Sequence, residues 1–269
     1  MNNKQIPQEY IDIIDVQVEK FSNHIEIIKK NKIPLNKDEI TSEQSNKWIQ
    51  INNVVCVYVD MKNSTQFSAS SHASTTGKIY TLFTGTAVRI FKKLGASYID
   101  IRGDGVFALF NEDEVHKALA SAVTFKTFAT EVFIPKVLAK KKEFDTGVHI
   151  GIDQGNLLVS KIGLKKYKNT TDMFNEVWAG KPVNFASKLA GLSNSDEILV
   201  SERYYKNIKN NAALYSCKCS EPTLLWEEVD LSFENKVPFD KAMKLESIWC
   251  KKHGAESLEN IIATDEESS

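Results

Sequence analysis

The sequence contains no hydrophobic run of the roughly 18 residues that a membrane-spanning helix needs. Its first residues, MNNKQIPQEY, lack the apolar core of a signal peptide. The formal net charge is only −1, so the overall charge gives no indication of a nucleic-acid-binding surface. Four cysteines in 269 residues are too few for a disulfide framework. We therefore expect a cytoplasmic globular protein whose partners include neither a membrane nor a nucleic acid.

The pattern of apolar and polar residues divides the chain into four parts. Residues 1–50 contain an amphipathic helix over 8–30 and a polar linker, and 51–210 form the main domain. A C-terminal extension follows at 211–254, and the acidic tail at 255–269 is expected to be disordered. The amphipathic helix is expected to pack on its own domain, with a dimer-forming helix as the alternative.

Strands and helices follow each other in the main domain. We predict a strand at 54–61, helices at 76–94 and 114–132, hairpins at 98–110 and 146–163, a helix that begins behind Pro182, and a strand with a short helix at 198–205. This order predicts an α+β fold, with a mixed or antiparallel central sheet and flanking helices packed on one face.

The stretch YIDIRGDGVFALF, residues 98–110, holds an aspartate between two glycines. Gly103 and Gly105 suit a tight hairpin that needs unusual backbone dihedrals, so Asp104 lies at its tip. A second carboxylate, Asp60, ends the apolar strand in VYVDMKNST. Each aspartate alone is equally well explained as a turn residue or a cap. If the strands are neighbours, however, both carboxylates meet at one edge of the sheet.

Two adjacent carboxylates repel each other unless a cation lies between them. Mg²⁺ suits such a pair, because proteins hold it with one or two carboxylates together with substrate phosphates. Asn184 and Lys188 are one helical turn apart and share a face. An amide and a cation on one face can bind a phosphate and stabilise developing negative charge.

Four stretches together resemble the class III nucleotidyl cyclases, the family of adenylate and guanylate cyclases. They are VYVDMKNST, YIDIRGDGVFALF, VHIGIDQGNLLVSKIG and EVWAGKPVNFASKL, in the family's order and over residues 54–205. RGDGVFALF with NEVWAGKPVNFASKLA is more closely similar to the pyrimidine cyclases (cytidylate and uridylate cyclases) of bacterial Pycsar antiphage systems. Those enzymes make cyclic CMP or cyclic UMP, which activates a separate effector protein. The resemblance implies the ferredoxin-like class III cyclase fold.

The same resemblance implies roles for individual residues. Asp60, the backbone carbonyl of Met61, and Asp104 match ligands of two divalent cations, Mg²⁺ or Mn²⁺, which also bind the triphosphate. Asn184 matches the asparagine that orients the ribose, and Lys188 stands where the family has a transition-state arginine. The phosphate-binding candidates are Lys62, Asn63, Ser64, Thr65 and Arg102. The metal ligands and the asparagine come from different protomers in this family, which implies a head-to-tail homodimer.

Three features depart from the family pattern. Lysine at position 188 is a point charge without the planar fork of arginine. The segment WAGKPVN is one residue longer than the usual spacing between tryptophan and asparagine. Asp100 stands where adenylate cyclases carry lysine and guanylate cyclases glutamate, and the second base-selecting position is Glu176 or Val177. Asp100 can accept from an exocyclic amine such as cytosine N4, or it can pair with Arg102 or Lys181 and contact no base.

Three functions stay open on these residues. The first is cyclisation of CTP or UTP to cyclic CMP or cyclic UMP. The second is adenylate or guanylate cyclase activity, and the third is an inactive, nucleotide-binding sensor. Retention of both Asp60 and Asp104 argues against the sensor, because nucleotide binding alone does not require two metal-binding carboxylates.

A second metal site is predicted near the C-terminus. Cys217 and Cys219 form a Cys-x-Cys pair, and Cys250 and His253 form a Cys-x-x-His pair. Three thiols and an imidazole are a plausible ligand set for structural Zn²⁺. The alternative is that these are unrelated side chains in a lysine-rich segment.

Overall fold

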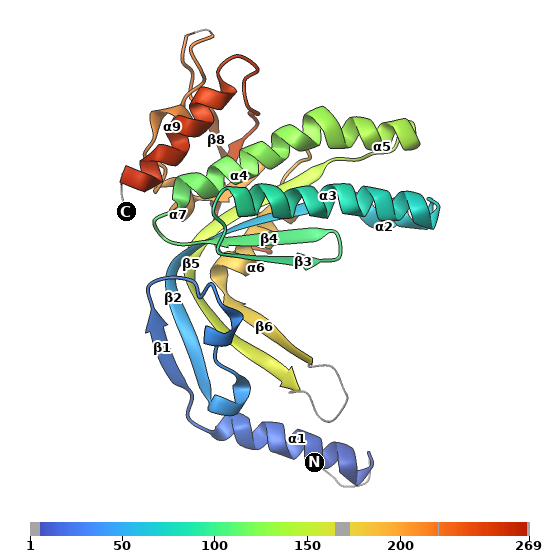
Figure 1. The fold of residues 1–269 in the computed structure, drawn as a ribbon, viewed down its shortest axis with the longest axis vertical. Helices are drawn as coiled ribbons and strands as arrows, with labels where there is room; N and C mark the ends of the chain where they lie inside the picture. The colour runs from blue at the N-terminus through green and yellow to red at the C-terminus, as the bar shows by residue number, and fades with distance from the viewer. Residues whose placement is uncertain (1–5, 165–172, 220, 268–269) are drawn as a thin grey trace.

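The computed structural model describes residues 6–164, 173–219 and 221–267, which form one sheet flanked by helices (Figure 1). Within these residues the sheet has nine strands, with a main path in the order β3-β4-β2-β5-β7-β9-β8, while β1 pairs with β2 and β6 with β5. Their bounds are β1 Glu26–Lys30, β2 Lys47–Met61, β3 Tyr98–Arg102, β4 Gly105–Phe110, β5 Val148–Leu164, β6 Met173–Gly180, β7 Ile198–Ser201, β8 Trp226–Asp230 and β9 Lys241–Leu245. The predicted α+β class and mixed sheet are confirmed.

The helices cover both faces of the sheet, although we expected them on one face. In chain order they are α1 Gln8–Ser22, α2 Ser64–Ala69, α3 Ala73–Lys93, α4 Val115–Phe128, a π-helix Ala129–Phe133, α5 Ile134–Lys140, α6 Lys181–Leu192, α7 Glu202–Tyr205, α8 Asn211–Leu214 and α9 Gly254–Glu267, with short 3₁₀ helices at Lys37–Glu39 and Glu43–Ser45. Helices α3 and α4 lie side by side over one face, and α6 packs on the other (Figure 1). Among the described residues, no helix is both long and apolar enough to cross a bilayer.

Strand β2 shows how alternation divides the sheet into two faces. Val57 and Val59 point into the core formed with α3 and α4. Cys56 belongs to the opposite core, where Ala186 of α6 is buried and where Tyr58 packs. The same alternation brings the side chain of Asp60 out on the α6 face, at the end of β2.

The segment at 146–163 is part of one long strand, β5, and not the hairpin that we predicted. Its glycines serve close packing rather than a turn. A Cβ atom on Gly151 would collide with the backbone of Ala186 and Ala190, so glycine here lets α6 lie directly on the strand. Gly155 lies against the guanidinium of Arg203. Strand β6 pairs antiparallel with β5, from Leu157 with Gly180 to Leu164 with Met173.

The N-terminal segment differs from the expected long helix. Helix α1 ends at Ser22, because residues 26–30 form β1 and pair in parallel with β2. The helix lies at the far end of an arm made by β1, β2, β5 and β6 (Figure 1). Its apolar side chains are largely exposed, with Phe21 88% exposed and Ile11 the buried one within α1. Our expectation that this helix packs on its own domain is therefore wrong.

The C-terminal part is integrated into the fold. Residues 211–254, expected to form an extension, supply β8 and β9 to the main sheet. The tail at 255–269 was expected to be disordered, but Gly254–Glu267 form α9, which packs on α4 (Figure 1). Ile261 is buried in the core, and the Asp265 carboxylate accepts from the backbone N–H groups of His116 and Lys117 at the start of α4. This tertiary contact overrides the acidic composition that led us to predict disorder.

Candidate active site

Asp60 and Asp104 meet at one edge of the sheet, as their sequence positions predict. The last paired residues of β2 and β4 are Val59 and Val106, so Asp60 lies next to the turn that carries Asp104. Gly105 makes this approach possible, since a Cβ atom there would overlap the Tyr58 hydroxyl and lie 3.3 Å from Asp60 Oδ1. The preceding Gly103 has a φ of +67°, which an L side chain rarely adopts. Both glycines of the hairpin are therefore explained by the geometry around the two carboxylates.

The electrostatics of this pair indicate a cation-binding site. Burial and the neighbouring Asp104 carboxylate raise the pKa of Asp60 to about 7. Burial also raises the pKa of Tyr58, with the charge of Asp60 as a further cause. Two partly buried carboxylates that repel each other are the donor set that Mg²⁺ or Mn²⁺ accepts. The backbone of Met61 follows Asp60 directly, so its carbonyl belongs to the same edge of the sheet.

The predicted phosphate-binding segment continues from Asp60 into α2. Lys62 Nζ lies 2.7 Å from Asp145 Oδ1, and the Asn63 amide donates to the Asp145 carboxylate at 3.0 Å. These two side chains are therefore engaged in fixing the loop. Ser64 begins α2 and is buried, and Thr65 is exposed beside it. The first N–H groups of a helix have no partner within the helix, so this segment can offer a phosphate its backbone more readily than its side chains.

Asn184 and Lys188 lie on the exposed side of α6, one turn apart. Pro182 occupies the first turn of this helix, as predicted, and Ala186 and Leu189 bury its opposite side. Lys188 Nζ lies 5.6 Å from the centre of the Phe185 ring. Among the described residues, neither Asn184 nor Lys188 forms a hydrogen bond or ion pair with Asp60 or Asp104. Ser187, which lies between Asn184 and Lys188 on α6, hydrogen-bonds the Tyr58 side chain, and Tyr58 lies beside Gly105 with Asp60, so α6 runs close to the carboxylates of its own chain.

Asp100 and Arg102 form an ion pair on β3. Arg102 Nη2 lies 2.6 Å from Asp100 Oδ2, and this buried oxygen has no hydrogen-bond partner among the described residues. Of the two pairings weighed from the sequence, the one with Arg102 is present. Lys181 lines a different part of the surface. The Arg102 side chain is 58% exposed and next to the hairpin turn that carries Asp104.

The second base-selecting candidate, Glu176, contacts Tyr98, which lies two residues before Asp100 on β3. The sequence analysis did not single out Tyr98. The Tyr98 hydroxyl donates to Glu176 Oε2 at 3.4 Å, and Lys37 Nζ lies 3.3 Å from the same oxygen. Burial raises the pKa of Tyr98 to about 12, with the charges of Asp100 and Glu176 as further causes. The Tyr98 ring lies 4.6 Å from that of Trp178. The alternation in YIDI puts Tyr98 and Asp100 on the same face of β3, and this pattern could have identified Tyr98 from the sequence.

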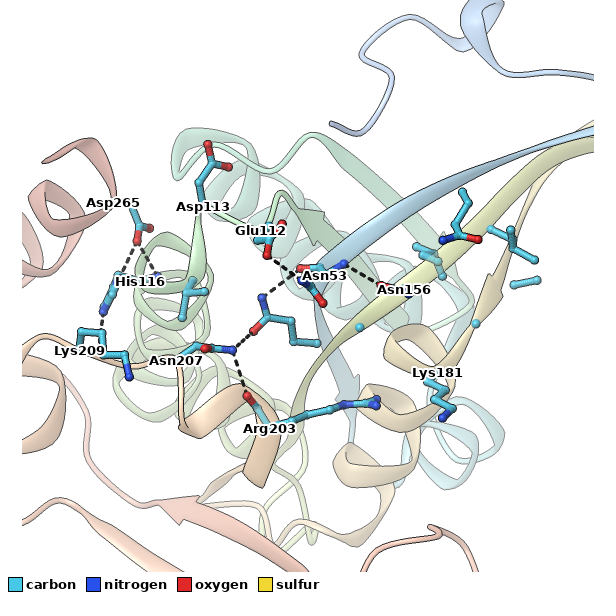
Figure 2. Close-up of a pocket in the computed structure, with 18 residues that line it drawn as sticks. Asn53, Glu112, Asp113, His116, Asn156, Lys181, Arg203, Asn207, Lys209 and Asp265 are labelled. Carbon is cyan, nitrogen blue, oxygen red and sulfur yellow. Dashed lines mark hydrogen bonds and ion pairs between the residues drawn. The ribbon is translucent and has the colours of Figure 1, made fainter. Parts of the chain in front are cut away.

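A large cavity lies elsewhere, at the bend of the sheet where β2, β5 and α7 meet (Figure 2). It encloses about 800 Å³ and is lined by Asn53, Gln154 and Asn156, by His116 with its partner Asp265, and by Lys181. None of Asp60, Asp104, Asn184 and Lys188 lines it. The predicted site residues therefore lie outside this cavity.

The structure also brings together the four predicted zinc ligands. Ligand atoms of Cys217, Cys219, Cys250 and His253 all lie within 4.8 Å of one another. They stand in the C-terminal part of the fold, far from Asp60 in the sequence. Cys56 is buried in the core, as predicted, and takes no part in this cluster.

Comparison with known proteins agrees with this architecture. Residues 47–225 match the model of the adenylate and guanylate cyclase catalytic domain. A uridylate cyclase from Propioniciclava tarda is 34% identical over 234 residues, which cover 84% of this chain and 74% of that protein. One from Micromonospora echinofusca is 33% identical over 79% of this chain and 70% of its own length.

The fold has solved counterparts. The crystal structure of the adenylyl cyclase CyaB from P. aeruginosa superimposes with a TM-score of 0.58 and 16% sequence identity, covering 76% of this chain and 97% of the other. At this identity the likeness concerns the fold alone. The matched domain spans the strands that carry Asp60 and Asp104 and the helix that carries Asn184 and Lys188. The chain belongs to the adenylate and guanylate cyclase catalytic domain family and is a nucleotide cyclase.

Proposed function

We propose that this chain converts UTP to 3′,5′-cyclic UMP and pyrophosphate. The observation that carries the proposal is the convergence of Asp60 and Asp104 beside Gly105, which supports a divalent-cation site at the sheet edge. The two relatives named uridylate cyclase support uracil as the base. Sequence patterns alone left CTP and UTP equally open.

The chain's own residues would act by holding and orienting the substrate. Asp60, the Met61 carbonyl and Asp104 would hold two divalent cations, which when bound lower the pKa of the ribose 3′-hydroxyl and neutralise the triphosphate. The segment that starts α2 and the Arg102 guanidinium would bind the phosphates. The 3′-oxygen then forms a bond to the α-phosphorus, the bond to the bridging oxygen breaks, and pyrophosphate leaves. Positioning and charge stabilisation dominate such reactions.

A second copy of the chain would complete each site. Asn184 and Lys188 are exposed on α6, where a second chain can contact them. In a head-to-tail dimer, Asn184 of one protomer would orient the ribose over the carboxylates of its partner, while Lys188 would stabilise charge on the phosphate. The exposed apolar residues of α1 fit the alternative of a dimer-forming helix.

Asp100 would read the base. Uracil presents an N3–H donor between two carbonyl acceptors, and the Asp100 carboxylate, which is paired with Arg102, would accept from this N–H group. Arg102 beside it can donate to a uracil carbonyl. Cytosine has no hydrogen on N3 and could approach Asp100 only through its N4 amino group, so CTP is the second candidate. Adenine or guanine would need more room next to Tyr98 and Trp178, whose rings lie 4.6 Å apart.

The biological role follows from the resemblance to antiphage pyrimidine cyclases. We infer that the cyclic nucleotide is a signal made after phage infection, and that a separate effector protein binds it. The effector and the activating event lie outside this chain. Purified chain without an activator can still be tested for the chemical step.

The deciding experiment incubates the purified chain with ATP, GTP, CTP and UTP in the presence of Mn²⁺ and identifies the products by mass spectrometry. We expect cyclic UMP from wild type and at least a ~100-fold loss in Asp104→Asn. Asp113→Asn, which changes an aspartate paired with Lys32 at the surface, is the matched control and should retain activity. Cyclic CMP as the product would change the assigned base from uracil to cytosine. Cyclic AMP or cyclic GMP would contradict a pyrimidine substrate. The absence of any product would favour the nucleotide sensor.

A further inference from the structure

The cysteine–histidine cluster joins two segments that are about thirty residues apart in the sequence. Cys217 and Cys219 stand in the segment between α8 and β8, and Cys250 and His253 stand just before α9. Cys219 Sγ lies 3.7 Å from Cys250 Sγ and 3.3 Å from His253 Nδ1, and Cys250 Sγ lies 4.0 Å from the same nitrogen. The nucleotide-cyclase site does not use any of these groups.

These separations match the edges of a zinc tetrahedron. With Zn–S bonds of about 2.3 Å and Zn–N bonds of about 2.0–2.1 Å, tetrahedral angles put two sulfurs about 3.8 Å apart and a sulfur and a nitrogen about 3.5 Å apart. The observed sulfur–sulfur separation of 3.7 Å agrees with that value. It is far longer than the roughly 2.05 Å of a disulfide bond, and all four cysteines are free.

The surroundings also suit thiolate ligands. Three thiolates and one Zn²⁺ carry a net charge of −1, and the exposed Lys218, Lys251 and Lys252 flank the cluster with positive charge. Three cysteines and one histidine fill all four positions of a tetrahedral site, which leaves none for a substrate.

We propose that Cys217, Cys219, Cys250 and His253 bind one structural Zn²⁺ ion. The ion would fasten the segment at 215–224 to the start of α9. Helix α9 in turn packs its Ile261 into the core and places Asp265 at the start of α4. Because binding such an ion is part of the folding free energy, zinc would hold α9 on the cyclase core without touching the nucleotide.

The test measures metal content in the full-length chain, purified from cells grown with added zinc. Wild type should contain about one zinc per chain by mass spectrometry of the metal, and Cys219→Ser and Cys250→Ser should each lose at least about 90% of it. Cys56→Ala removes a thiol outside the cluster and should keep the zinc. His253→Cys supplies a fourth thiolate and should keep it as well.

A second readout does not depend on how well the variants fold. Wild type in which Co²⁺ replaces Zn²⁺ should show the strong thiolate-to-cobalt charge-transfer band and the intense visible bands of a tetrahedral site. Iodoacetamide should leave Cys217, Cys219 and Cys250 unmodified until a chelator removes the metal. A wild-type chain that takes up neither metal against a weak chelator would overturn the proposal. Full zinc retention in both Cys219→Ser and Cys250→Ser would overturn it too.

Discussion

Asp60 lies beside Gly105, the residue after Asp104, so closely that a Cβ atom at position 105 would come within 3.3 Å of Asp60 Oδ1. The Tyr58 hydroxyl fills the space that a side chain at 105 would need. Burial and the charge of Asp104 raise the pKa of Asp60 to about 7. In the absence of a cation, this arrangement is therefore stabilised by a proton on Asp60.

The first prediction concerns stability and pH in the metal-free chain. Because the folded state raises the pKa of Asp60, it binds this proton more tightly than the unfolded chain does. The resulting stability is present below about pH 4 and is lost as the pH rises through about 7. We expect the free energy of unfolding to fall by on the order of 1–2 kcal/mol between about pH 5 and about pH 7.5, as measured by guanidinium denaturation in EDTA.

Two comparisons separate Asp60 from other titrating groups. Asp104→Asn removes the repelling charge, so its stability should decline less steeply over the same pH range. Saturating Mn²⁺ should stabilise wild type more at the higher pH, where the carboxylates are ionised. Equal slopes for wild type and Asp104→Asn would show that the two carboxylates do not interact.

The second prediction tests whether the site is shared between two chains. Asp104→Asn and Asn184→Ala should each be inactive alone, because each damages both sites of a homodimer. After mixing and reassociation, half of the dimers carry one intact site, so about one quarter of wild-type activity should return. Mixing Asp104→Asn with Asp60→Asn, which damage the same half of the site, should restore none. No recovery in either mixture would mean that one chain carries the whole site.

The third prediction concerns base recognition by Asp100. Asp100→Ala should lower kcat/KM for UTP about 10- to 100-fold, because a hydrogen bond between a charged group and the base is lost. Product formation from CTP and UTP should be compared for each variant. Asp38→Ala changes an exposed aspartate on a surface 3₁₀ helix and is the control. An equal loss for both nucleotides would assign Asp100 to holding Arg102 rather than to selecting the base.

The fourth prediction concerns Lys188. Lys188→Met should lower kcat about 100-fold, while Lys188→Arg should stay within about tenfold of wild type because it keeps the positive charge. Lys181→Met alters a lysine on the same helix that lines the cavity of Figure 2, and it should change kcat little. Single-turnover kinetics with UTP is the measurement. Full activity of Lys188→Met would remove this residue from the proposed site.

The fifth prediction compares two glycines. Gly105→Ala should destabilise the chain by on the order of 1–3 kcal/mol and weaken Mn²⁺ binding, because its Cβ atom displaces the Tyr58 hydroxyl. Gly77 lies exposed in α3 with nothing within 4 Å of an added Cβ atom. Gly77→Ala should therefore be neutral or stabilising by up to about 1 kcal/mol. Denaturation of both variants in EDTA gives the comparison, and equal stabilities would contradict the packing at Gly105.

Local patterns predicted the parts of the site that depend on neighbouring residues. The hairpin at 98–110 and the helix behind Pro182 follow from alternation, turn glycines and a helix-start proline. The glycines of β5 misled the same reasoning, because Gly151 serves contact with α6 and not a turn. Contact between Tyr98 and Glu176 joins residues 78 positions apart and depends on the packing of β3 near β6, which no local pattern encodes.

One feature of β2 has a mechanical consequence. Its pairing with β5 shifts between Ile51 and Val54, so the ladder is interrupted where the arm that carries α1 leaves the body of the sheet. Asn53 spans this gap with its own side chain and backbone, bonding to Glu112, Gln154 and Asn156 around the cavity of Figure 2. At this joint, hydrogen bonds around Asn53 resist bending of the arm, in place of a continuous backbone ladder. Water molecules can replace these side-chain hydrogen bonds, so we expect the arm to bend here.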